Sequence, residues 1–143
     1  MVSIADVGLG ISQTLPVAVA LHAANPGRLI YIEQPEIHLH PRAQSAMAEV
    51  LADAALQGKR LVVETHSSLL LLGIQTLVAE GKLAPEMVKL HWFKLLDDGS
   101  TQITSADLDE TGAFSDWPED FATVTLDSES HYLDAAEARM RGK

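Results

Sequence analysis

Residues 29–41 read L-I-Y-I-E-Q-P-E-I-H-L-H-P, an apolar run that ends abruptly in polar side chains and a proline. The four apolar residues, 29–32, predict a buried strand. Glu33 then lies at the carboxyl end of that strand. Because ligands bind at this edge of an open parallel sheet, the stretch predicts a site as well as a strand.

A second apolar run, residues 61–63, is followed by E-T-H-S-S at residues 64–68. Between the two runs, residues 42–56 carry apolar side chains at spacings of three and four, which predicts a crossover helix packed on a sheet. Strand, helix and strand would form a parallel βαβ unit. Such a unit brings Glu33, Gln34 and His66 to one edge.

Local signals also place the helix ends. Pro41 suits the first turn of the crossover helix, and Gly58 suits its end. Ser67 or Ser68 can cap the next helix, which is predicted to close at Gly81.

Together with D-V-G-L-G-I-S-Q at residues 6–13, these segments resemble the second half of an ABC-type ATPase head. Such heads occur in chromosome-maintenance, recombination-repair and overcoming-lysogenization-defect proteins. Their motif order is P-loop, signature motif, Walker B strand and switch histidine, and the last three appear here over residues 6–72. The resemblance implies an α/β fold, a partial P-loop NTPase with three layers, parallel strands and crossover helices.

The resemblance implies ATP as the ligand of the segment around residues 8–13, where Gly8, Gly10, Ser12 and Gln13 would bind the nucleotide held by an opposite subunit. The helix that follows is predicted to cap near Ser12, with Pro16 in or just past its first turn, leaving N–H groups free for phosphate. The family's usual L-S-G-G-Q core is G-L-G-I-S-Q here, so either Gly8 or Ser12 could stand in for the signature serine. The alternative is a glycine-rich turn that only caps a core helix.

Residues after the first strand carry the chemistry that the resemblance implies. Glu33 takes the Walker B position, where a carboxylate reaches Mg²⁺ through water. Gln34 takes the position of the catalytic glutamate; an amide can orient water but cannot accept its proton. Glu36 is the alternative general base, or else it caps a backbone turn. His66 would be the switch histidine that donates to the γ-phosphate, with a structural histidine as the alternative.

A third interpretation of these residues is a metal-dependent hydrolase. His38 and His40 form an H-x-H pair, and Glu33 and Glu64 could join it in a metal cluster. A catalytic zinc site needs three well-placed protein ligands. The spacing alone does not supply them.

Composition limits the function classes. The 143 residues predict one domain, and a formal net charge of −10 argues against a surface that is basic throughout, as nucleic-acid binders usually have. There is no cysteine, hence no disulfide framework. Neither a bilayer-spanning run nor a secretory signal is found, so we expect no membrane partner and a cytoplasmic location.

The remainder of the chain has a different pattern. Two β-prone runs, 88–95 and 101–104, flank D-D-G-S and predict a C-terminal β-hairpin. We therefore divide the chain into residues 1–105, the C-terminal part of an ATPase domain, and residues 106–143, an acidic loop and a terminal amphipathic helix starting near Asp127.

No G-x-x-x-x-G-K-[ST] motif occurs in the sequence, so the loop that cradles the β- and γ-phosphates is not supplied by this chain. We expect part of a longer ATPase or one half of a split one, inactive without its P-loop. Its partners would be ATP, a P-loop-bearing segment or second copy, and nucleic acid only through other domains. The alternative is a non-catalytic dimerisation or regulatory module that responds to nucleotide.

Overall fold

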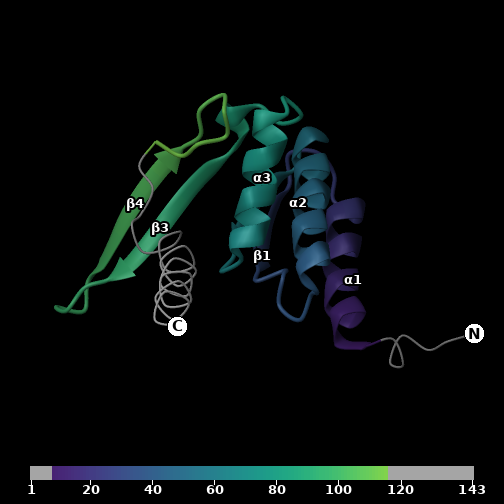
Figure 1. Cartoon of the computed structure of the whole chain (residues 1–143). Coiled ribbons are helices and arrows are strands. Elements are labelled where there is room, and N and C mark those ends of the chain that lie inside the picture. Colours follow the sequence, from purple (N-terminus) through teal and green to yellow (C-terminus); the bar gives the residue numbers. More distant parts are fainter. Residues whose placement is uncertain (1–7, 116–143) are drawn as a thin grey trace, which may run out of the picture.

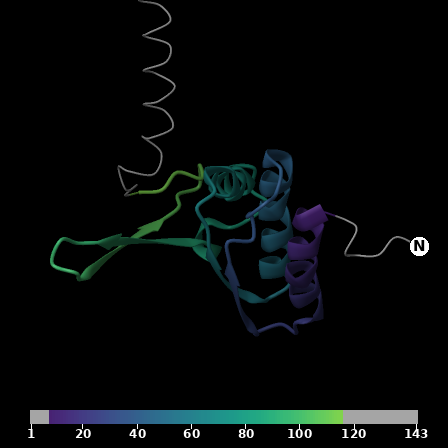
Figure 2. The same cartoon turned by 90° about the horizontal axis from the view of Figure 1, so that it is seen from below.

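A computed structural model describes residues 8–115 of the chain. Three helices lie side by side over a pair of strands, and a hairpin extends away from them (Figures 1 and 2). The elements in chain order are α1 (Gly8–Ala23), β1 (Leu29–Glu33), α2 (Pro41–Leu56), β2 (Arg60–Glu64), α3 (Ser68–Ala79), the 3₁₀ turn η2 (Pro85–Met87), β3 (Lys89–Leu95) and β4 (Thr101–Asp107).

The predicted βαβ unit is confirmed. β1 and β2 pair in parallel, with Glu33 opposite Glu64 at the carboxyl end. Pro41 opens α2 as predicted, and Gly58 follows the helix with a φ of +82°. Ser67 caps α3, because its hydroxyl accepts a hydrogen bond of 3.1 Å from the Leu70 N–H. These ends follow from local chemistry alone.

One core lies between the inner face of the strand pair and the helices. The inner-face side chains Ile30, Ile32, Leu61 and Val63 alternate with outward ones along the strands. They pack on buried side chains from all three helices: Leu21, Met47, Leu51, Ala54 and Leu70. The alternation is that of a sheet with one covered face.

The outer face of the strand pair differs from the prediction of a three-layer fold. Leu29, Tyr31 and Val62 point outward and are 61%, 60% and 49% exposed. Within residues 8–115 the helices pack on the inner face, so the described part has two layers. The predicted fold had helices on both faces of the sheet. A sheet face is buried only where helices pack on it, and the described helices pack on one face.

α1 begins earlier than predicted. It runs from Gly8, so the predicted cap near Ser12 is wrong, and Pro16 lies inside the helix instead of near its first turn. Apolar side chains Val17 and Leu21 hold the helix to the core. Packing of this kind outweighs the weak helix propensity of the two glycines and the cost of an internal proline.

The predicted hairpin is confirmed: β3 and β4 pair antiparallel from Lys89↔Asp107 to Leu95↔Thr101. A second core at its base joins α2 and α3 to the residues after β4, and includes Ala48, Leu77, Leu108 and Phe114. The division of the chain at residue 105 stays a prediction. The predicted terminal helix near Asp127 lies outside the described residues.

No helix within residues 8–115 combines the length and apolar character that a bilayer crossing would need.

Candidate functional site

The loops after β1 and β2 meet at the carboxyl edge of the strand pair. Together with Gln44 of α2 they form an open pocket of about 340 Å³ lined by Gln34, Glu36, Ile37, His38, Gln44, His66 and Ser67. Three of the site residues predicted from the sequence, Gln34, Glu36 and His66, therefore line one pocket.

The loop after β1 turns back on itself. Gln34 and His38 have φ values of +44° and +63°, a region that side-chain-bearing residues seldom adopt. The Ile37 N–H donates to the Gln34 carbonyl, and the Leu39 N–H donates to the Glu36 carbonyl. These two overlapping turns place Glu36 toward the loop after β2.

Glu36 is the buried acid of the site, with only 6% of its surface exposed. Its Oε1 accepts two hydrogen bonds, from the Thr65 hydroxyl at 2.7 Å and from the His66 backbone N–H at 2.8 Å. Its Oε2 is buried and has no hydrogen-bond partner among the described residues. A buried polar atom left without a partner costs about 1–3 kcal/mol, so this oxygen points to a missing donor.

The bonds around Glu36 continue into both helices. Ser67 donates through its hydroxyl to Gln44 Oε1 at 2.8 Å, and Gln44 Nε2 donates to the Leu39 carbonyl at 3.0 Å. The Ser67 N–H donates to the Thr65 hydroxyl at 3.0 Å. The loop after β1, the loop after β2, α2 and α3 are thus joined in one hydrogen-bond circuit.

Glu33, the predicted Mg²⁺ residue, lies beside this pocket and does not line it. It is exposed at the end of β1, with Glu64 as its neighbour on β2. Tyr31 donates a hydrogen bond of 2.8 Å to Glu64 Oε2 on the same outer face. This bond raises the pKa of Tyr31, with smaller contributions from burial and from the charges of Glu64 and Glu33.

The four predicted nucleotide-binding residues of the signature segment all lie within α1. Gly8 and Gly10 are in its first turn, and Ser12 and Gln13 are exposed further along. Gly10 approaches the post-β1 loop: a Cβ built on it would lie 3.2 Å from the His38 carbonyl oxygen.

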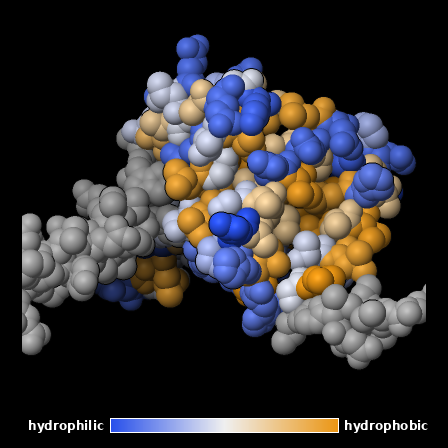
Figure 3. Space-filling view, turned by 45° about the vertical axis from the view of Figure 1, so that its right-hand side comes forward, coloured by the Kyte–Doolittle hydropathy of each residue, from blue (hydrophilic) through white to orange (hydrophobic). Residues whose placement is uncertain are grey.

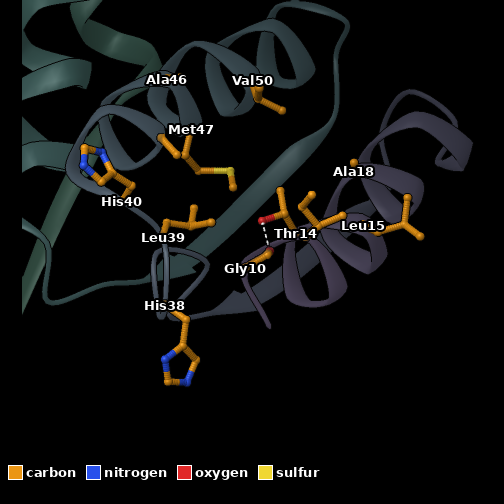
Figure 4. A pocket seen from close by; sticks show the side chains of 12 residues that line it. Gly10, Thr14, Leu15, Ala18, His38, Leu39, His40, Ala46, Met47 and Val50 are labelled. Atoms are coloured by element: carbon orange, nitrogen blue, oxygen red, sulfur yellow. Dashed lines mark hydrogen bonds between the residues drawn. The ribbon is translucent and has the colours of Figure 1, made fainter. Parts of the chain in front are cut away.

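A larger groove of about 510 Å³ runs between α1 and α2. Its lining is mostly apolar, and in Figure 4 Leu39 and Met47 point toward α1 while the ring of His38 points away. Figure 3 brings the α1 side forward and shows hydrophobic residues exposed on it among hydrophilic ones. This groove is larger but predominantly apolar, whereas an amide, a carboxylate and an imidazole line the smaller pocket, so the smaller pocket is the better candidate site.

The alternative of a metal cluster is not favoured by the geometry. Among residues 8–115, no group of three or more histidine, aspartate or glutamate side chains is close enough to hold a metal ion. His40 instead caps α2, its Nδ1 accepting from the Arg42 N–H at 3.3 Å. The H-x-H spacing therefore has a structural explanation for one of its two histidines.

The pocket fits part of a nucleotide site. An amide, a carboxylate and an imidazole line it, but neither lysine nor arginine does. The negative charge of a triphosphate would need cations from elsewhere, which agrees with the lack of a P-loop motif in the sequence.

Two residues of the site were not predicted from the sequence. Thr65 and Gln44 carry the contacts that fix Glu36 and Ser67. Thr65 precedes His66 in E-T-H-S, and its position beside a predicted site residue was a sequence signal that could have identified it. Gln44 lies on a helix with no local signal.

Comparison with known protein families shows a match over the first half of the chain. Residues 2–72 match a family model of an AAA domain. That family is described as "AAA domain, putative AbiEii toxin, Type IV TA system", and the matched residues make up about half of the chain. The match supports an AAA-like P-loop ATPase fragment with a nucleotide-binding, ATPase-type function. No curated protein and no solved structure matches the chain.

Proposed function

We propose that this chain supplies the Walker B and switch-histidine side of an ABC-type ATPase site. The observation that carries the proposal is the polar pocket in which Gln34, Glu36 and His66 converge at the carboxyl edge of parallel strands. Ligands bind at this edge in open α/β sheets. The match of residues 2–72 to an AAA domain supports the coarser part of the proposal, a nucleotide-binding, ATPase-type function.

Each residue has a role that its chemistry allows. The Gln34 amide orients the attacking water, and the Glu36 carboxylate, two residues further along, accepts the proton that Gln34 cannot. His66, exposed at the pocket, donates to the γ-phosphate. Glu33 would hold Mg²⁺ through water, and the ion when bound would neutralise phosphate charge.

The remaining parts come from outside the chain. A P-loop-bearing segment would supply the phosphate cradle and its lysine. The first turn of α1, around Gly8 and Gly10, would face the nucleotide of a second copy, which is the signature role in ABC-type heads. Any contact with nucleic acid would be made by other domains.

A second candidate is a nucleotide-responsive module that does not hydrolyse ATP. Two observations favour it: Gln34 stands where a carboxylate is usual, and the Glu36 carboxylate is buried and bonded to the loop after β2. A buried acid must become accessible before it can take a proton from water.

ATP binding and hydrolysis should be measured for the purified chain with and without an added P-loop-bearing segment. We expect ATP binding and ATP hydrolysis only when the segment is present. The hydrolysis rate should fall at least tenfold in His66→Ala, because a hydrogen-bond donor to the transferring phosphate is lost. Gln34→Glu should leave this rate unchanged if Glu36 is the base, and should raise it if the missing carboxylate at residue 34 is what limits hydrolysis.

The outcomes separate the two candidates. Binding without hydrolysis in the complemented protein, restored by Gln34→Glu, would identify the nucleotide-responsive module. Absence of nucleotide binding under any condition would refute both. Thr76→Val is the control, because Thr76 is exposed on α3 and its hydroxyl bonds only within that helix, to the Leu72 carbonyl.

A further inference from the structure

The Glu36 carboxylate is held asymmetrically. Both donors that reach it, the Thr65 hydroxyl and the His66 N–H, bind the same oxygen, Oε1. Oε2 is the oxygen without a partner among the described residues. The carboxylate therefore has one oxygen held by the protein and one that is buried without a donor among the described residues, so that a ligand reaches Oε2 only when the pocket opens further.

The Thr65 hydroxyl is itself oriented. It accepts a hydrogen bond from the Ser67 N–H at 3.0 Å, and so it presents its own proton to Glu36 Oε1 at 2.7 Å. A hydroxyl has one donor, and here that donor has one acceptor. The direction of the Thr65–Glu36 bond follows from this arrangement.

The support extends to the helices through Ser67. Its hydroxyl accepts from the Leu70 N–H at the start of α3 and donates to Gln44 of α2. Gln44 in turn holds the Leu39 carbonyl in the post-β1 loop, three residues after Glu36. Both ends of the Thr65–Glu36 bond are thus anchored to the same two helices.

We propose that Thr65 is the positioning residue for Glu36: it fixes Oε1 and leaves Oε2 as the oxygen that accepts a proton or hydrogen bond from the ligand. This inference rests on the function proposed above. In this proposal the hydroxyl of Thr65, the residue before His66, orients the Glu36 carboxylate. The hydrogen bond also connects the loop that carries His66 to the loop that carries Glu36. Displacing either loop changes the direction in which Oε2 points.

The first test uses the chain without any nucleotide. The exchange rate of the His66 amide proton measures how well its hydrogen bond to Glu36 is kept. Thr65→Val keeps the shape and removes the hydroxyl, and we expect exchange at His66 to become about tenfold faster as Glu36 loses its orientation. Thr65→Ser and the control Thr76→Val should leave exchange at His66 within about twofold.

Glu36→Gln separates positioning from proton transfer. Its amide oxygen can accept both hydrogen bonds of Oε1, so protection at His66 should be kept, whereas the ability to take a proton is lost. Unchanged exchange at His66 in Thr65→Val would overturn the proposal, because Glu36 would then be oriented without the hydroxyl.

The second test uses the chain complemented with a P-loop-bearing segment. Thr65→Val should lower kcat about tenfold and leave the KM for ATP unchanged, and Thr65→Ser should restore kcat. A loss in Thr65→Val that Thr65→Ser does not rescue, or an unchanged kcat, would overturn the proposal.

The two tests fail separately. If the complemented wild-type protein does not hydrolyse ATP, the proposed ATPase function fails and the catalytic meaning of Oε2 fails with it. The exchange experiment still decides whether Thr65 positions Glu36, because it requires neither nucleotide nor turnover.

Discussion

Tyr31 links the two parallel strands on their outer face through its hydrogen bond to Glu64. The bond raises the pKa of Tyr31 above 10.0. A group whose pKa is higher in the folded state stabilises the fold below its unfolded pKa and loses that contribution as the pH rises through the folded pKa. The stabilisation should therefore be complete at neutral pH and disappear above pH 10.

The prediction is tested by urea unfolding of the wild type and Tyr31→Phe at pH 8 and pH 11. The wild type should lose its advantage over the variant between these values, because ionised Tyr31 would face Glu64 and Glu33. An equal pH dependence of the two proteins would show that the bond to Glu64 does not persist in solution.

At the scale of elements, Gly112 locks the turn after β4 against α3. Its φ is +77°, and a Cβ at this position would press on the carbonyl oxygen of Gln75. Gln75 Nε2 also donates to the Gly112 carbonyl at 2.8 Å. Because both strain and a backbone clash arise, Gly112→Ala should lower the free energy of unfolding by about 2–3 kcal/mol.

Gly99 in the hairpin turn provides the matched control. Its φ of +81° is similar, but no atom lies within 4 Å of a Cβ built there. Gly99→Ala should therefore cost only about 1 kcal/mol, the strain term alone. Equal losses in urea unfolding would mean that the turn after β4 does not contact α3 in solution.

At the scale of the whole molecule, the parallel strand pair is covered on one face only within residues 8–115. Parallel sheets are normally covered on both faces, and two strands are few for an independent sheet. Here Leu29, Tyr31 and Val62 are exposed on the outer face while Val63 packs on the inner core. The exposed face could pack against a covering layer, and each strand has one edge without a strand partner among residues 8–115; under the function proposed above, a P-loop-bearing segment would supply both.

Val62 and Val63 test this arrangement as a matched pair on one strand. Val63→Thr should destabilise the chain by about 1–2 kcal/mol because it places a hydroxyl against the core, whereas Val62→Thr should change stability by less than about 0.5 kcal/mol. Urea unfolding measures the loss of unfolding free energy in each variant. An equal loss in Val62→Thr would show that the outer face is covered in solution.

The sequence by itself determined the elements whose signals are local. Apolar runs gave the strands, spacing gave the crossover helix, and Pro41, Gly58 and Ser67 marked helix ends, because each of these effects acts within one turn. The parallel βαβ order placed Glu33, Gln34 and His66 at one edge, and in the structure Gln34 and His66 line the pocket there while Glu33 lies beside it.

Only the tertiary structure decided what these residues contact. Glu36 meets Thr65 across 29 positions in the chain, and the contact depends on strand register and on the positive φ of Gln34 and His38. α1 continues through Pro16 because Val17 and Leu21 pack against the core beyond it. The exposure of the outer sheet face likewise depends on which face the helices cover. A local sequence pattern does not predict which face that is.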